Sequence, residues 1–162
     1  MKIILSLLTI ALAVVLAPPA AEAEQWQRLY TQWQGSANPL DIYNGGSYNN
    51  YAHLAPRGDY SGQMWRVTED GNWSRLTTQF RGEDMCLDVT NGGPMDNYVA
   101  LTPCGNYSGQ HWRLRQEGDW YRLTTQFRGD DMCLDIVNGG EFNGMAHLVE
   151  CGTYSGQFWH LD

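Results

Sequence analysis

The stretch “NYSGQHW” (residues 106–112) occurs three times in this chain with small changes. The other copies are “DYSGQMW” (residues 59–65) and “TYSGQFW” (residues 153–159), so that successive copies are 47 residues apart. In every copy a glutamine stands two residues before a tryptophan. An interval this regular indicates an internal structural repeat, so the chain is expected to contain three copies of one unit.

Other segments keep the same interval, and they align without a gap. One set is “RLYTQWQG” (residues 28–35), “RLTTQFRG” (75–82) and “RLTTQFRG” (122–129). A second set is “PLDIYNGG” (residues 39–46), “CLDVTNGG” (86–93) and “CLDIVNGG” (133–140). The repeat therefore extends well beyond the short motif.

The two ends of the chain complement each other. The third copy stops at Asp162, before a counterpart of the segments around Trp73 and Trp120, whereas Trp26 keeps their 47-residue interval at the other end. We therefore expect a pseudo-threefold ring that is closed by the N-terminal strand. The expected repeats are approximately residues 24–68, 69–115 and 116–162.

Each unit is predicted to hold four short strands separated by turns. In the second repeat the strands are expected at residues 73–80, 85–89, 98–102 and 110–115, between turn-forming stretches such as “RGED” and “NGGPMD”. A four-stranded unit also fits a propeller blade, but three blades are fewer than the usual minimum of about four. The sequence therefore predicts an all-β fold, in the form of a closed threefold barrel with a hairpin cap.

Residues 1–23 have the pattern of a secretory signal peptide. Lys2 precedes an apolar run at residues 3–16, and “AEA” supplies the small residues that a signal peptidase prefers. An uncleaved membrane anchor is the alternative, but the apolar run is shorter than the roughly 20 residues that span a bilayer. Cleavage after Ala23 would leave one secreted or periplasmic domain, residues 24–162, that is not inserted in a membrane.

The charge of the chain argues against several partners. The formal net charge is −8, and Lys2 is the only lysine, so every other basic side chain belongs to arginine. Phosphate backbones and anionic membranes attract clustered positive charge, and the arginines form no basic run. Nucleic acid and anionic membrane surfaces are therefore not expected as partners.

The four cysteines favour disulfides, because the chain is expected to be exported. Cys86 and Cys104 are 18 residues apart, and so are Cys133 and Cys151, so two equivalent local bridges are the simplest pairing. The first repeat has Pro39 and Arg57 at these positions and lacks the bridge. A zinc site is not favoured, because the chain has no Cys-x-x-Cys pair. No metal or other cofactor is predicted.

These units resemble the repeats of the ricin B-type lectin family, whose mark is Gln-x-Trp near the end of each repeat. The resemblance covers residues 24–162. It includes three Gln-x-Trp motifs in register, each preceded by a Leu-Asp pair whose aspartate lies 22 residues before the glutamine. The resemblance implies a β-trefoil fold and non-catalytic carbohydrate binding.

By the same resemblance, three aspartates are expected to accept hydrogen bonds from neighbouring sugar hydroxyls, since ionised carboxylates are strong acceptors. The motif glutamines either brace these aspartates or contact the ligand directly. An aspartate near “NGG” could instead form an Asx turn, and the asparagines of these stretches (Asn44, Asn91 and Asn138) are assigned to turns. The expected carbohydrate-binding residues are Asp41, Asp88, Asp135, Gln63, Gln110 and Gln157.

The galactose site familiar in the family is not reproduced. An aromatic residue is missing two positions before the second cysteine, and glycine replaces the asparagine that usually precedes the motif glutamine. The substituted positions are Ala55, Thr102 and Val149 in the first case and Gly62, Gly109 and Gly156 in the second. The class of sugar is therefore left open.

Other side chains could supply the aromatic platform that the apolar face of a sugar ring needs. A tyrosine recurs in the loop before each motif, where it either meets the ligand or seals the end of the barrel. The third strand of the units presents tyrosines and histidines outward, with Ala100 in place of histidine in the second repeat. The additional carbohydrate-binding candidates are His53, Tyr60, Tyr98, Tyr107, His147 and Tyr154. The motif tryptophans are assigned to the core.

The favoured function is that of a monomeric lectin with up to three weak sites, which gain strength on polymeric glycans through multivalency. The alternative is a protein-binding trefoil, such as a protease inhibitor or the attachment subunit of a toxin. An enzyme is not expected. The acidic pairs Glu83–Asp84 and Asp130–Asp131 resemble glycosidase carboxylates only in composition, because adjacent residues diverge on a strand or turn.

Overall fold

The computed structural model describes residues 25–162, and the predicted signal peptide lies outside the described residues. In chain order the first elements are β1 (Leu29–Thr31), the 3₁₀ helix η1 (Gly35–Ala37), β2 (Leu40–Ile42), β3 (Ala52–Leu54), η2 (Ser61–Gln63) and β4 (Trp65–Asp70). They are followed by β5 (Trp73–Thr78), β6 (Gly82–Val89), β7 (Val99–Pro103), η3 (Ser108–Gln110) and β8 (Trp112–Glu117). The last are β9 (Trp120–Thr125), β10 (Met132–Ile136), β11 (Ala146–Glu150), η4 (Ser155–Gln157) and β12 (Trp159–Leu161).

The all-β prediction is confirmed, since the described part of the chain contains strands and single-turn 3₁₀ helices but no α-helix. One boundary in the second repeat was predicted wrongly. Gln110 was expected to begin a strand, but it ends η3, and β8 begins two residues later at Trp112. The “SGQ” triplet forms a single 3₁₀ turn instead, in which the amide of Gln110 donates to the carbonyl of Tyr107 at 3.0 Å.

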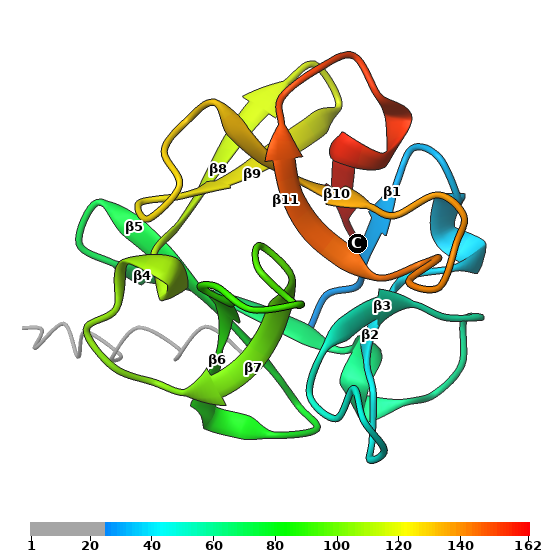
Figure 1. Ribbon diagram of the computed structural model, residues 1–162, viewed down its shortest axis with the longest axis horizontal. Coiled ribbons are helices and arrows are strands. Elements are labelled where there is room, and N and C mark those ends of the chain that lie inside the picture. Colours follow the sequence, from blue (N-terminus) through cyan, green and yellow to red (C-terminus); the bar gives the residue numbers. More distant parts are fainter. Residues whose placement is uncertain (1–24) are drawn as a thin grey trace, which may run out of the picture.

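Three hairpins gather around a central axis, as Figure 1 shows: β2–β3, β6–β7 and β10–β11. Each hairpin is bonded to the next one through its backbone. The amide of Leu101 donates to the carbonyl of Asn50 at 2.9 Å, and that of Leu148 donates to Asn97 at 2.9 Å. The amide of Leu54 then donates to Gly144 at 2.8 Å, so the third hairpin is also joined to the first.

The remaining strands form antiparallel pairs on the other side of these hairpins. β4 pairs with β5 and β8 pairs with β9 over six residues each. The corresponding pair in the third repeat joins the two ends of the described chain, with Leu29 of β1 opposite Leu161 of β12. Just before β1, Gln27 also exchanges two backbone hydrogen bonds with Trp65, at 2.8 and 2.7 Å.

Two equivalent tryptophans, Trp26 and Trp73, make the same contact with an arginine. The guanidinium of Arg66 lies 4.2 Å from the ring centre of Trp26, and that of Arg113 lies 4.5 Å from Trp73. Such cation–π contacts contribute roughly 0.5–1 kcal/mol at exposed sites. The N-terminal Trp26 is therefore packed in the same way as its counterpart in the middle of the chain.

The core is built on the three motif tryptophans, as predicted, and all three are fully buried. Trp112 donates its indole hydrogen to the carbonyl of Leu87 at 2.8 Å, and the equivalent bonds of the other two measure 2.9 Å. Those bonds run from Trp65 to Leu40 and from Trp159 to Leu134. Because each indole is both buried and hydrogen-bonded, it fixes the end of one repeat against the strand that carries its aspartate.

The predicted disulfides are confirmed. Cys86 is bonded to Cys104 and Cys133 to Cys151, and each bridge joins the two strands of one hairpin near their outer end. In the unbridged first repeat, Arg57 instead approaches the carboxylate of Asp162 at 3.8 Å.

Removing one bridge tests how much the covalent closure stabilises the fold. The double variant Cys133→Ser/Cys151→Ser is expected to unfold with a free energy lower by about 3 kcal/mol, because the unfolded chain regains the freedom of an 18-residue loop. Urea unfolding followed by tryptophan fluorescence measures this change. An unchanged midpoint and slope would show that the hairpin hydrogen bonds alone determine stability here.

Candidate functional site

The aspartate of each repeat is held by hydrogen bonds to both of its oxygens. In the second repeat, Oδ1 of Asp88 accepts from the amide of Val89 at 2.8 Å, and Oδ2 accepts from Nε2 of Gln110 at 3.1 Å. The same two bonds, of 2.7 and 3.0 Å, are made by Asp41 with Ile42 and Gln63, and by Asp135 with Ile136 and Gln157. Each half-buried carboxylate is therefore fixed in one orientation.

The motif glutamines are completely buried, with no exposed surface. Besides holding Asp88, Nε2 of Gln110 donates to the carbonyl of Pro103 at 3.0 Å, and its Oε1 accepts from the amide of Gly105 at 2.9 Å. Gln63 and Gln157 repeat this pattern. Of the two predicted roles, the structure therefore supports bracing, and direct contact with a ligand is not available to a side chain without exposed surface.

In the second and third repeats, an arginine donates a hydrogen bond to the motif glutamine. Nη1 of Arg122 donates to Oε1 of Gln157 at 3.0 Å, and Nε of the same arginine donates to Glu117 at 2.9 Å. Arg75 links Asp70 to Gln110 in the same way, at 2.6 and 3.1 Å. A chain of charged and polar groups thus runs from the surface to the site carboxylate.

The glycine before each motif glutamine leaves room for the carboxylate. A Cβ atom at Gly109 would lie 2.3 Å from Oδ1 of Asp88, and the equivalent distances in the other repeats are 2.2 Å. No side chain fits there without displacing the aspartate. An asparagine like that of the familiar galactose site would therefore displace the aspartate from its present position.

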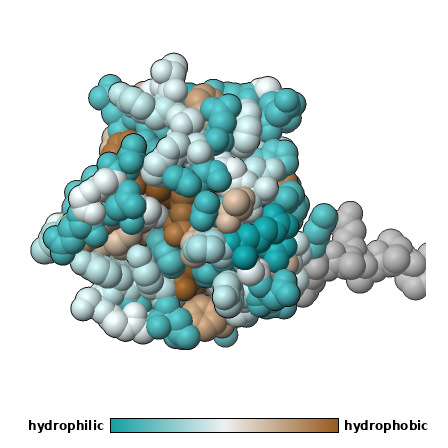
Figure 2. Space-filling view, turned by 90° about the vertical axis from the view of Figure 1, so that its right-hand side faces the viewer, coloured by the Kyte–Doolittle hydropathy of each residue, from teal (hydrophilic) through white to brown (hydrophobic). Residues whose placement is uncertain are grey.

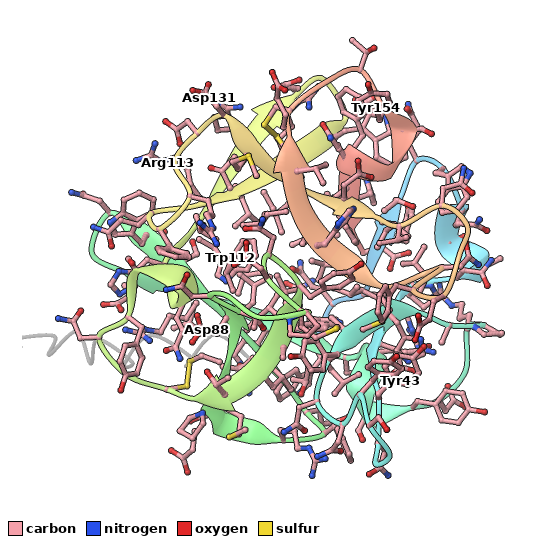
Figure 3. The ribbon with its side chains drawn as sticks, in the orientation of Figure 1. Tyr43, Asp88, Trp112, Arg113, Asp131 and Tyr154 are labelled. Atoms are coloured by element: carbon pink, nitrogen blue, oxygen red, sulfur yellow. A yellow bond between two sulfur atoms is a disulfide. The ribbon has the colours of Figure 1, made fainter. Side chains whose placement is uncertain are left out.

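The loop tyrosines are the most exposed large hydrophobic residues described: 61% for Tyr60, 61% for Tyr107 and 65% for Tyr154. They therefore do not seal the barrel. Figure 3 shows Tyr154 at the outer edge of the molecule, whereas Trp112 lies near its centre. Each tyrosine ring rests on the glycine two residues before it, where an added Cβ would lie 2.3–2.5 Å from the ring. The rings are thus held in place although they are exposed.

Each repeat has a hollow in which its aspartate and its loop tyrosine meet. We call them hollow one, two and three after the repeat that supplies the aspartate, and their volumes are about 330, 380 and 210 Å³. The turn asparagine and the serine and glycine of the motif complete the lining. On the face drawn in Figure 2, hydrophilic residues surround a narrower, recessed band of apolar ones.

An aromatic residue from another repeat also lines each hollow, and it was not predicted from the sequence. Phe80 lines hollow one, Phe127 lines hollow two and Trp33 lines hollow three. The backbone amide of each aromatic donates at 3.2 Å to the carbonyl of the motif serine across the repeat boundary. The signal was present in the repeated “TQW” and “TQF” triplets, whose aromatic position recurs every 47 residues.

The histidines and Tyr98 lie beside the aspartates but outside these hollows. His53 is opposite Asp41 on the neighbouring strand, and its ring stacks on Tyr43 with 3.6 Å between centres. His147 is opposite Asp135, and its ring lies 5.5 Å from that of Tyr98. Tyr98 therefore belongs to the surroundings of the third aspartate, although it lies in the second repeat.

The hydrogen bonds near the “NGG” stretches show which side chains close the turns. The turn in the second repeat is closed by Asp96, whose Oδ1 accepts from the amide of Gly92 at 2.6 Å, and Asn49 and Asn143 do the same in the other repeats. Asp88 takes no part in that turn. The exposed Asn91 precedes the turn and lines hollow two, and Asn44 and Asn138, which were likewise assigned to turns, line hollows one and three.

The acidic pairs weighed as glycosidase carboxylates lie on the surface. Glu83 forms an ion pair with Arg66, and Asp130 forms one with Arg113 at 2.7 Å. Among residues 25–162, no group of three His, Cys, Asp or Glu side chains could hold a metal ion. The same residues include no helix that is long and apolar enough to cross a membrane.

Comparison with known families identifies the domain. A model of the ricin-type β-trefoil lectin domain matches residues 28–154. The chain belongs to this family. A search of curated proteins finds no match.

Solved structures confirm the β-trefoil. ThreeFoil, a designed threefold-symmetric protein, is 21% identical with a TM-score of 0.70, over 84% of this chain and 96% of its own. The Macrolepiota procera ricin B-like lectin, solved in complex with lactose, is 16% identical with a TM-score of 0.67, and the match covers 88% of this chain and 98% of the lectin. A mosquitocidal holotoxin is 11% identical with a TM-score of 0.73, and the match covers 88% of this chain but only 17% of the toxin.

The fit between glycine and carboxylate can be tested directly. Gly109→Ala is expected to push Asp88 away from the amide of Val89 and to lower the free energy of unfolding by about 1–3 kcal/mol, as overpacking usually does. The amide proton shift of Val89 in an NMR spectrum reports the broken hydrogen bond, and urea unfolding reports the stability. Ser108→Ala, which adds no atom, is the control. An identical Val89 shift in both variants would show that the carboxylate is not held where the structure has it.

The half-buried side chains of His53 and His147 predict a pH dependence. Burial lowers the pKa of His147 below 6.5, although the nearby Asp135 opposes this shift. The unfolded chain therefore takes up the proton more readily, and stability should be lost as the pH falls below about 6.5. His147→Gln is expected to lose less stability between pH 7 and pH 5, as measured by thermal unfolding. Equal losses in the two proteins would contradict this assignment.

Proposed function

We propose that residues 24–162 form a secreted, non-catalytic lectin with up to three weak carbohydrate sites, one in each hollow. The observation that carries this proposal is the repeated pairing of a braced carboxylate with an exposed tyrosine ring. A sugar needs both, because its hydroxyls donate hydrogen bonds and one face of its ring is apolar. A tyrosine ring offers this surface at a low cost in conformational entropy. The two disulfides support an extracellular location.

The unused acceptor positions set what each aspartate can bind. A carboxylate has about four lone-pair positions. Asp41 and Asp135 each receive two hydrogen bonds within the protein, which leaves about two for a pair of neighbouring hydroxyls. Asp88 receives a third, from Thr102 at 2.9 Å, and keeps about one. The second site should therefore recognise fewer hydroxyls through its carboxylate than the other two.

Three sites on one rigid body act together on a polymer. A monosaccharide is expected to bind with roughly millimolar affinity at each site, and a polysaccharide or a crowded glycan surface more tightly through effective concentration. The protein is proposed to act as a monomer, without nucleic acid and without membrane insertion after signal cleavage. The acidic domain carries no basic cluster that would change this view.

A second candidate is attachment of a larger partner through protein contacts. The similarity to one part of a mosquitocidal holotoxin favours it, because the trefoil there is a small share of a long chain. The three related hollows favour sugar binding instead, since a protein-binding surface would need no repeated carboxylate. An assay for released reducing sugar tests the remaining possibility of catalysis, and no release is expected.

Removing the carboxylates one at a time tests the proposal. Asp41→Ala, Asp88→Ala and Asp135→Ala are each expected to remove about one third of the binding capacity on a glycan array while folding persists, because each deletes one acceptor. Asp131→Ala, at an exposed aspartate outside the hollows, should bind as the unmodified protein does. Undiminished binding by a variant that carries all three of these substitutions would rule out the three hollows as sugar sites.

A further inference from the structure

The second repeat differs from the other two at the position opposite its aspartate. Asp41 faces His53 and Asp135 faces His147 across their hairpins, whereas Asp88 faces Ala100. In the first and third repeats an imidazole ring therefore covers the strand beside the carboxylate. In the second repeat only a methyl group stands there.

The space left by the smaller residue is a hollow of about 470 Å³. We call it the side hollow, and it is lined by Asn49 and Tyr51 of the first repeat and by Asp88, Thr90, Asn91 and Ala100 of the second, among others. Asp88 and Asn91 also line hollow two. The side hollow and hollow two therefore lie next to each other, with Asp88 at their border.

Tyr51 gives the side hollow its own aromatic wall. Its counterpart Tyr98 pairs with His147 through a backbone bridge and lies against the ring of that histidine. Tyr51 makes the same backbone bridge with Ala100, which has no ring to set against it. In the first repeat the corresponding bridge is made by Met145 with His53, and His53 is itself covered by Tyr43. Only the second repeat thus combines a tyrosine at this bridge with an alanine opposite the aspartate.

We propose that the second repeat binds two linked sugar units of one glycan chain, whereas the first and third bind one. One unit lies in hollow two against Tyr107, and the next lies in the side hollow against Tyr51, with Asp88 between them. This inference rests on the proposed function of the hollows. It makes Ala100 the residue that determines the length of ligand recognised by this repeat.

A ligand of two sugar units is consistent with the limited hydrogen-bonding capacity of Asp88, which has about one acceptor position left. Because Thr102 occupies one of its oxygens, Asp88 is left with fewer positions for a first sugar than the other aspartates have. The side hollow adds contact area and a polar neighbour, Thr90, that does not line hollow two. The second repeat should therefore gain from a second unit more than the others do.

NMR titration of ¹⁵N-labelled protein tests the proposal site by site. The probes are matched pairs of monosaccharide and disaccharide: galactose and lactose, glucose and cellobiose, mannose and α-1,2-mannobiose, and xylose and xylobiose. The amides of Ser61, Ser108 and Ser155 report hollows one to three, and that of Leu101 reports the side hollow. For a pair that binds, the disaccharide should be favoured about tenfold at the second repeat and less than about threefold at the others.

Two reciprocal variants exchange alanine and histidine at the position opposite the aspartate. Ala100→His is expected to lower the preference of the second repeat to less than about threefold, and His147→Ala to raise that of the third repeat toward tenfold by uncovering Tyr98. Equal preferences at all three repeats, or a Leu101 amide that no disaccharide shifts, would overturn the inference while leaving the three sites intact. If Ala100→His does not fold, an unchanged preference in His147→Ala overturns it. If no sugar shifts any of the three serine amides, the proposed function fails, and this inference fails with it.

Discussion

The hydrogen bond between a buried glutamine amide and a surface aspartate is the contact on which the candidate sites depend. The amide of Gln110 has two donors and one acceptor in use, and its side chain has no exposed surface. A buried amide left without partners would cost about 1–3 kcal/mol, so the glutamine has one acceptable orientation. Trp112, two residues later, is fixed in the core by its own hydrogen bond to Leu87. Core and carboxylate are therefore joined through three residues of chain, and the site shares the rigidity of the barrel.

The threefold plan is kept in the glutamine and glycine beside the carboxylate and in the tyrosine of each hollow, and it is relaxed on the strand opposite the carboxylate. All three repeats share the aspartate, the glutamine and the glycine between them, with bond lengths that agree within 0.1 Å. The residues around the carboxylate differ, since His53, Ala100 and His147 occupy equivalent positions. One supporting framework thus carries three carboxylates whose opposite strands differ.

The sequence predicted the architecture because its repeats are regular and its turns are well marked. Their size and repetition placed the motif tryptophans in the core, and the spacing of 18 residues selected the two disulfides. It could not predict which repeat supplies each wall of a hollow. Periodicity identifies equivalent residues, but contacts across a repeat boundary depend on how the units are rotated about the axis. Phe127 was missed for this reason.

Because each hollow is lined by residues from two repeats, the pairing of β1 with β12 contributes to hollow three as well as to the fold. Each hollow takes its aspartate and tyrosine from one repeat and an aromatic wall from the next. For hollow three the next repeat is the first, because Trp33 lies just after β1 and its amide is bonded to Ser155. This contact exists only because β1 pairs with β12. A single unit would therefore lack the aromatic wall of its own hollow, and a linear array would leave its last hollow incomplete, whereas three units joined end to end complete all three.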